Sequence, residues 1–227
     1  MIIKEINVDE RKLNYFIGIN QIQLNFKDYL ELKNISSDKD ALDIIFNLII
    51  KIQEKFTDSI LQFIDDSLIL NEHHIFSALY FVQKAFQDKI NILNKKNMEL
   101  LLYLTTKRQI KKGIESFGMK ITSLKEGFLT YVVVSAKNNI IEINQEILQL
   151  LGAKDGELTI TKPSIERFNR IKQHFQISNE QINSIRNSYG FNQKDNVEDD
   201  LESLFLAVHD LLCEKMSILS LEKVKID

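Results

Sequence analysis

The sequence has one cysteine, one proline and only seven glycines among its 227 residues. The lone cysteine, Cys213, excludes a disulfide framework within the chain and any metal site built from several thiolates. So few prolines and glycines leave little material for the flexible linkers that separate domains. We therefore expect a single domain over residues 1–227.

Long apolar runs are also absent, because no uninterrupted stretch approaches the ~20 residues that a membrane-spanning helix needs. The first ten residues, MIIKEINVDE, lack the apolar core of a signal peptide. With 44% hydrophobic and 27% charged residues, the composition is that of an ordinary soluble globular protein. These features predict a cytoplasmic protein that has no membrane partner.

Hydrophobic periodicity predicts strands and helices in an irregular order. Runs rich in β-branched and aromatic residues predict strands at residues 2–3, 15–23, 60–64 and 129–135. Residues 98–104 (MELLLYL) fit either element, and a buried strand is favoured. Apolar residues at helical spacing predict helices at 38–56, 71–86, 106–118, 142–151, 163–174, 179–187 and 198–216. The expected fold class is α+β, with a mixed or antiparallel central sheet flanked by several helices and a long C-terminal helix.

The motifs of the common enzyme classes are missing as well. The chain has no GxxxxGK phosphate loop, no GxGxxG turn and no GxSxG nucleophile elbow. His73 and His74 are expected to be partly exposed on a helix, where adjacent side chains diverge by about 100° and cannot share a metal. Asp65-Asp66 is typical of a turn, and Cys213 of a free thiol in a core or an interface. We therefore expect a binding or regulatory protein without cofactor or metal, with a small-molecule enzyme as the weakest alternative.

Residues 89–120 form a basic segment in an acidic chain. They contain eight basic and two acidic side chains, whereas the whole chain carries a net charge of −3. Thr106-Lys107-Arg108-Gln109 has the T-x-x-Q form of a capping box, which predicts that a helix begins at Thr106. Lys107 and Arg108 would then face the positive end of the helix dipole, and a phosphate bound to the free amides would offset that repulsion. The alternative is a solvated basic face without a ligand. The core side of this helix is expected to comprise Ile110, Ile114 and Phe117.

Several short blocks between residues 72 and 219 carry a resemblance to a known family. The blocks are Glu72-His73-His74-Ile75 with Ala78 and Phe86, Met98-Glu99-Leu100-Leu101-Leu102-Tyr103-Leu104, Arg108-Gln109-Ile110 and Gly118, and more weakly residues 175–178 and 212–219. They resemble the smallest regulatory subunit of the KEOPS complex, the PRPK-binding protein (TPRKB) family, over roughly residues 60–222. The chain departs from the family in Thr106-Lys107, which replaces a small pair, and in an extra polar segment near 187–200.

The resemblance implies a non-catalytic subunit with two partners. Family members bind the small kinase-ATPase subunit of the complex, and archaeal members bind tRNA through its single-stranded CCA end. The complex makes threonylcarbamoyl-adenosine in tRNA, and the transfer step belongs to another subunit. The basic segment is the candidate tRNA site in this sequence, through Lys95, Lys96, Lys107, Arg108, Gln109 and Lys111. Tyr103 is a candidate for stacking on a terminal base, and a core tyrosine is at least as good an interpretation. An adaptor that regulates the kinase without binding tRNA is the alternative function.

The C-terminal helix is the candidate kinase interface. Its residues Leu201, Leu204, Phe205, Val208, Leu211, Leu212 and Met216 form one apolar stripe, which is a normal core face. Leu206 and Cys213 fall to one side of the stripe, with His209 between. Because the resemblance implicates the end of the family's chain in kinase binding, we expect Leu206, His209, Cys213, Ser217, Ile218 and Leu219 to contribute to that interface. A second contact with the protein's own sheet is the alternative.

Overall fold

A computed structural model describes residues 1–8, 13–33, 35, 37–191 and 197–221. The chain forms two compact units, and each contains two separate stretches of sequence. The sheet unit comprises Met1–Asp65 with Gly118–Thr159, and the helical unit comprises Asp66–Phe117 with Ile160–Asp227. The expectation of a single domain stays a prediction.

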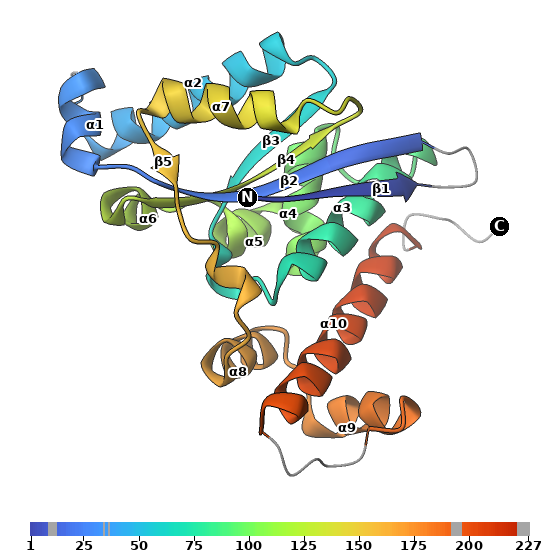
Figure 1. Ribbon diagram of the computed structural model, residues 1–227. Coiled ribbons are helices and arrows are strands. Elements are labelled where there is room, and N and C mark those ends of the chain that lie inside the picture. Colours follow the sequence, from blue (N-terminus) through green and yellow to red (C-terminus); the bar gives the residue numbers. More distant parts are fainter. Residues whose placement is uncertain (9–12, 34, 36, 192–196, 222–227) are drawn as a thin grey trace. The chain divides into compact units, whose positions relative to one another are not determined.

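The sheet unit is built on an antiparallel sheet with the order β1-β2-β4-β3 (Figure 1). Its strands are β1 (Ile2–Val8), β2 (Leu13–Gln23), β3 (Ser59–Ile64), β4 (Phe128–Ser135) and β5 (Lys154–Asp155). The register of the central pair places Ile19 of β2 opposite Val132 of β4. The short β5 pairs with Ile22 and Gln23 of β2, beyond the residues that β1 pairs. The predicted α+β class and antiparallel sheet are thus confirmed.

Helices α2 and α7 lie side by side over the sheet and share its apolar core (Figure 1). The helices of this unit are α1 (Phe26–Lys33), α2 (Asp38–Lys55), α6 (Ile121–Glu126) and α7 (Ile140–Leu151). The predicted start of α2 is confirmed, because the Ser37 side chain accepts a hydrogen bond from the Asp40 amide as an N-cap. The core joins buried residues of both helices to the sheet, among them Ile45, Ile52, Phe63, Tyr131, Ile143 and Ile147.

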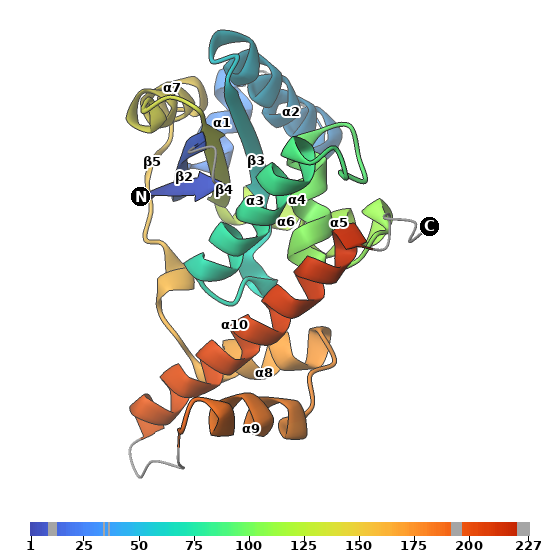
Figure 2. The same cartoon turned by 90° about the vertical axis from the view of Figure 1, so that its right-hand side faces the viewer.

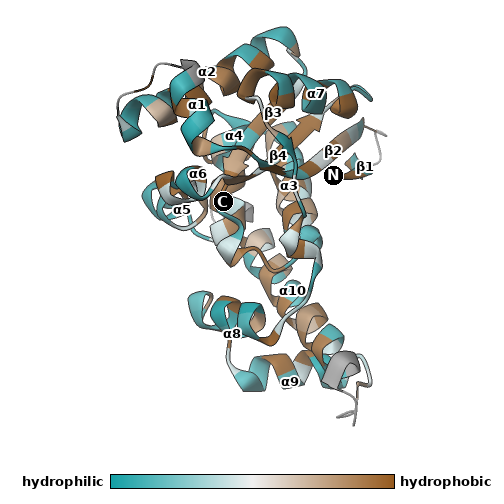
Figure 3. Cartoon of the chain, turned by 60° about the vertical axis from the view of Figure 1, so that its left-hand side comes forward, coloured by the Kyte–Doolittle hydropathy of each residue, from teal (hydrophilic) through white to brown (hydrophobic). Residues whose placement is uncertain are grey.

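The described part of the helical unit consists of helices. They are η1 (Asp66–Leu68), α3 (Glu72–Gln87), α4 (Lys96–Thr105), α5 (Ile110–Phe117), α8 (Ile165–His174), α9 (Asn179–Ser188) and α10 (Val197–Leu221), and η2 (Thr159–Thr161) leads into them. The long α10 packs against α3, α8 and α9 (Figure 2). Its apolar residues are interrupted by hydrophilic ones along its length, as a helix with one buried face requires (Figure 3).

The predicted strand at 98–104 is wrong, because these residues belong to helix α4. All residues from Glu99 to Thr105 are buried. A helix buried on every side has no polar face, so its sequence lacks the 3.6-residue stripe by which amphipathic helices are recognised. A short apolar run of this kind looks the same in a buried strand and in a buried helix, and only the packing of α3 and α5 around α4 resolves it.

No helix within the described ranges is both long and apolar enough to cross a lipid bilayer.

Candidate functional site

The turn between α4 and α5 overturns the predicted capping box. Thr106 does not begin a helix. It ends α4 in the left-handed conformation, with φ 51° and ψ 31°. The amide of Lys107 donates to the Leu102 carbonyl at 3.2 Å, which closes the last turn of α4, and α5 begins only at Ile110. Lys107 and Arg108 therefore lie in a connection and not in the first turn of a helix, so the argument for a phosphate on free helix amides no longer holds there.

Two of the predicted tRNA-binding cations are engaged within the helical unit. The Arg108 guanidinium donates to the Leu219 carbonyl of α10 at 2.9 Å. The Lys96 ammonium donates to Gln83 Oε1 at 2.7 Å and lies 5.4 Å from the centroid of the Phe86 ring. Partial burial lowers the pKa of Lys96. Both side chains thus help to hold helices together, which reduces what they can offer an RNA.

The other predicted polar contacts are exposed and fall into two groups. Lys95 is exposed where α4 begins, while Lys107, Gln109 and Lys111 are exposed beyond its end. Because a ten-residue helix is about 15 Å long, the two groups sit at opposite ends of α4. The cluster beyond the end of α4, which we call the α4–α5 basic cluster, consists of Lys107, Lys111 and the neighbouring exposed Lys112.

His174, at the end of α8, belongs beside this cluster. Burial lowers its pKa, and the charge of Lys107 lowers it further. This neighbourhood is not predictable from the sequence, because His174 and Lys107 are far apart in the chain and come near each other only in the folded unit. Lys120 is no part of the cluster. It pairs with Asp65 in the sheet unit.

Tyr103 is a core residue, which is the alternative interpretation to stacking on an RNA base. Its side chain is fully buried, and its ring stacks on that of Phe81 with centroids 6.0 Å apart and an interplanar angle of 5°. A ring in this position cannot stack on an RNA base without leaving the core, so we no longer assign it to the tRNA site.

The core face of α5 also differs from the prediction. Ile114 is 48% exposed, whereas Gly113 and Phe117 are buried. A Cβ at Gly113 would lie 3.1 Å from the Leu101 carbonyl oxygen of α4, so glycine allows the two helices to approach closely. The close approach at Gly113 turns Ile114 outward, next to the exposed Lys111.

The acidic residue of the MELLLYL block, Glu99, binds backbone amides of the segment that precedes α4. Its carboxylate is fully buried and accepts hydrogen bonds from the amides of Ile92 at 2.9 Å and Leu93 at 2.6 Å. Charge-assisted bonds to two backbone amides fix the segment that precedes α4 and carries Lys95. The role of Glu99 is therefore structural. The MELLLYL motif contains this residue, but the motif alone does not indicate the role.

The two adjacent histidines of α3 differ in environment. His73 is exposed, as expected, but His74 is fully buried, which corrects the prediction that both are partly exposed. The Nδ1 atom of His74 accepts a hydrogen bond from the Leu70 amide at 3.3 Å. Burial, and then the neighbouring His209, lowers the pKa of His74 to about 3, so the ring is neutral near pH 7.

Helix α10 confirms the separation of a core stripe from a lateral edge. Five of the seven predicted stripe residues, Phe205, Val208, Leu211, Leu212 and Met216, are buried, Leu201 and Leu204 are half-buried, and Leu206 is 39% exposed. His209 and Cys213 are half-buried on the same edge as Leu206, and His209 Nε2 lies 3.0 Å from the Ser77 hydroxyl and 3.5 Å from the Cys213 sulfur. Burial raises the pKa of the Cys213 thiol, which does not favour a nucleophile.

At the end of α10, only some of the residues predicted for the interface are accessible. Ile218 is 45% exposed and Ser217 is half-buried, so both remain candidates. Leu219 is only 5% exposed, and its carbonyl accepts from Arg108, so its side chain belongs to the core and is withdrawn from the proposed interface.

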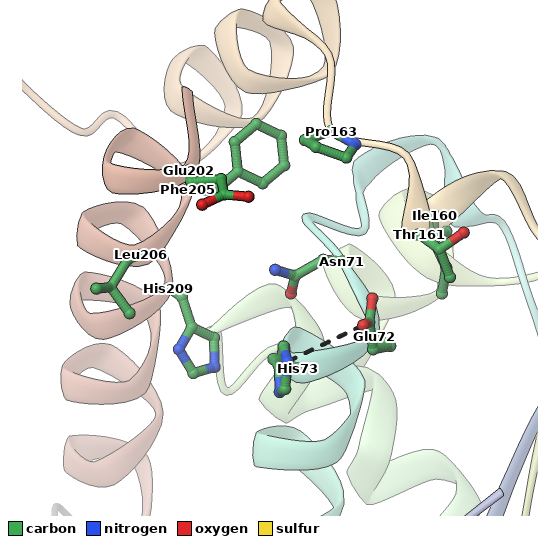
Figure 4. Close-up of a pocket in the computed structure, with 10 residues that line it drawn as sticks. All are labelled: Asn71, Glu72, His73, Ile160, Thr161, Pro163, Glu202, Phe205, Leu206 and His209. Atoms are coloured by element: carbon green, nitrogen blue, oxygen red, sulfur yellow. Dashed lines mark ion pairs between the residues drawn. The ribbon is translucent and has the colours of Figure 1, made fainter. Parts of the chain in front are cut away.

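A pocket of about 490 Å³ opens beside this edge of α10 (Figure 4). Its apolar wall is formed by Ile160, Pro163, Phe205 and Leu206, and its polar rim includes Glu72, His73, Glu202 and His209. The sequence did not predict this pocket, because its three walls come from separate segments. Among the described residues, no group of three or more histidine, cysteine or carboxylate side chains could hold a metal ion.

Comparison with known protein families shows the family of this chain. The model of the family "Kinase binding protein CGI-121" matches residues 32–210. The chain belongs to this family. The match confirms the resemblance to the PRPK-binding protein family and supports the binding of a kinase. No curated protein matches the chain.

Proposed function

We propose that this protein is a non-catalytic subunit of a cytoplasmic KEOPS complex, which binds the small kinase-ATPase subunit and recruits tRNA through its CCA end. The observation that carries the proposal is the match to a family of kinase binding proteins over residues 32–210. The absence of recognisable catalytic motifs in the sequence suits a recruiting role. The tRNA would be a substrate for the threonylcarbamoyl-adenosine chemistry of a partner subunit.

The lateral edge of α10 is the proposed kinase-binding surface. It presents the exposed Leu206 with the half-buried His209 and Cys213, and the half-buried Ser217 and exposed Ile218 extend the surface at the end of the helix. Leucine and isoleucine exposed on the helix that also supplies the core stripe are available to a partner without any unfolding. A helix edge of this kind supports an apolar contact with another protein.

A pull-down with the kinase subunit tests this surface. Leu206→Arg should keep the circular dichroism spectrum of the wild type and lose the kinase, because a long charged side chain would replace an apolar contact in the interface. Glu142→Arg, exposed on α7 of the sheet unit, introduces the same side chain away from α10 and should bind normally. Phe205→Arg should unfold the unit, because Phe205 is 5% exposed. A folded Leu206→Arg protein that binds as well as the wild type would remove this edge from the interface.

The α4–α5 basic cluster supports the tRNA half of the proposal. Lys107, Lys111 and Lys112 are exposed and close in sequence, and lysines suit a flexible phosphate backbone better than a fixed base edge. Binding of tRNA with and without its terminal CCA tests this half directly. We expect the truncated tRNA to bind at least tenfold more weakly, and equal binding of the two would exclude recruitment through the CCA end.

The second candidate is a kinase-binding adaptor without tRNA binding. It is favoured by the internal contacts of Lys96 and Arg108 and by the burial of Tyr103, which leave fewer groups for RNA than the sequence predicted. A protein that binds the kinase but shows no saturable binding of either tRNA would establish this candidate.

A further inference from the structure

The pocket beside α10 combines an apolar interior with an acidic rim. Phe205, Leu206, Ile160 and Pro163 form its apolar part, and Figure 4 shows the carboxylates of Glu72 and Glu202 coming from α3 and α10. None of the ten residues that line it is a lysine or an arginine. The pocket therefore places two carboxylates around an apolar space.

The rim carboxylates are weakly engaged by the rest of the unit. Glu72 Oε1 lies 4.0 Å from His73 Nε2, at the limit of an ion pair. Glu202 is exposed and forms no ion pair with the described residues. The ring of His209 is engaged elsewhere, because its Nε2 lies 3.0 Å from the Ser77 hydroxyl and its Nδ1 lies 3.8 Å from Asp210 Oδ1.

An anionic occupant is disfavoured even though α3 begins at the pocket. The Asn71 side chain already accepts from the His74 amide at 3.1 Å, and Glu72 supplies a carboxylate to the first turn. The chain's own groups thus satisfy the positive end of the helix. Two carboxylates on the rim would repel a phosphate or another carboxylate, so the charge selects a cation.

We propose that this pocket receives an apolar side chain of the kinase subunit, flanked by a lysine or arginine that pairs with Glu72 and Glu202. The inference rests on the proposed function, which supplies the partner. Leu206 and His209 belong both to the pocket and to the proposed kinase-binding edge, so the pocket continues that surface. A volume of about 490 Å³ accommodates a side chain and its neighbours. The apolar wall provides the burial, and the acidic rim selects a basic segment.

Calorimetric titration of the purified protein with the kinase subunit tests the inference. The Glu72→Gln/Glu202→Gln variant keeps side-chain size and removes both charges. Its affinity should fall about tenfold, as expected for two partly exposed ion pairs, and its salt dependence should flatten. Glu202→Lys alone should weaken binding further than Glu202→Gln, because it adds repulsion. Should Glu72→Gln disturb the start of α3, the two single variants at the exposed Glu202 still carry the test.

The control variant is Glu115→Gln/Glu142→Gln, which removes the same charge from exposed positions on α5 and α7 outside the pocket and outside α10. It should bind the kinase like the wild type. A wild-type protein that does not bind the kinase would overturn the proposed function. A wild-type protein that binds, with Glu72→Gln/Glu202→Gln unchanged in affinity and salt dependence, would overturn only the docking site. Self-association that depends on Glu72 and Glu202 would also overturn it, because the occupant would then be a second copy.

Discussion

The imidazole of His74 is fully buried in the helical unit, 6.1 Å from the ring of Phe117 and 5.8 Å from that of Phe175. Its pKa is lowered from 6.5 to about 3 in the folded protein, whereas the unfolded chain keeps the ordinary value. Between these two values the unfolded state binds the extra proton. The free energy of unfolding should therefore be undiminished by His74 above pH 6.5 and should fall as the pH drops below it.

Urea unfolding between pH 7 and pH 5 tests this coupling. In the wild type, one proton taken up on unfolding corresponds to a limiting slope of about 1.4 kcal/mol per pH unit. His74→Asn keeps an acceptor for the Leu70 amide and should show a flatter profile from a lower starting stability. His73→Asn, at the exposed neighbour, should keep the wild-type profile. Equal slopes in the two variants would exclude His74 as the group responsible.

A substitution at Tyr103 distinguishes a role in the core from a role in binding nucleic acid. Tyr103→Leu keeps an apolar side chain in the core and removes the ring. We expect lower thermal stability and an unchanged affinity for tRNA, because the ring is fully buried against Phe81. A base-stacking tyrosine would instead contribute about 1–3 kcal/mol to RNA binding. A folded Tyr103→Leu protein with tRNA affinity reduced tenfold or more would return Tyr103 to the site.

The element that carries Tyr103 shows where prediction from sequence stops. Strands β3 and β4 and helices α2 and α3 were found because their periodicity, β-branched residues or N-caps are local signals. Helix α4 was missed because it is buried on all sides. Thr106-Lys107-Arg108-Gln109 has the letters of a capping box, yet a threonine in the left-handed conformation ends a helix there. Local sequence could not distinguish the two ends, since the choice depends on how α5 packs at Gly113.

In the candidate site too, some features are predictable from the local sequence and others depend on the fold. The exposure of Leu206 beside a buried stripe followed from helical geometry alone. The hydrogen bond of Arg108 to Leu219, the effect of the Lys107 charge on the pKa of His174 and the place of Glu202 in the pocket wall all join segments distant in sequence. Charge counted along the chain located a basic segment but could not show which of its cations were already in use.

Glu99 is the residue on which the segment before α4 depends. Glu99→Gln removes the charge from the bonds to the Ile92 and Leu93 amides, and hydrogen bonds to charged groups contribute roughly 1.5–3 kcal/mol. We expect a comparable loss of unfolding free energy and faster hydrogen exchange at both amides. Glu115→Gln, exposed on α5, should leave both quantities unchanged. Unaltered exchange at Ile92 and Leu93 in the Glu99 variant would show that the carboxylate does not hold this segment.

At the scale of the whole molecule, a net charge of −3 coexists with the local α4–α5 basic cluster. A protein of this charge gains no general attraction for RNA, so any affinity must come from few phosphates and must depend on where the lysines stand. Lys111 is a better candidate than Arg108 for binding phosphate together with Lys107, because the Arg108 guanidinium already donates to the Leu219 carbonyl.

The salt dependence of tRNA binding counts those phosphates. Each phosphate neutralised on a single strand contributes about 0.7 to the magnitude of the slope of log affinity against log salt concentration. Lys107→Gln/Lys111→Gln should therefore reduce that slope by about 1.4, if each lysine contacts one phosphate, and should weaken binding most at low salt. Lys39→Gln/Lys51→Gln removes the same charge from exposed positions on α2 and should retain the slope, because it changes net charge without touching the cluster. If both double variants flatten the slope equally, the effect is one of overall charge, and the α4–α5 basic cluster is not the contact.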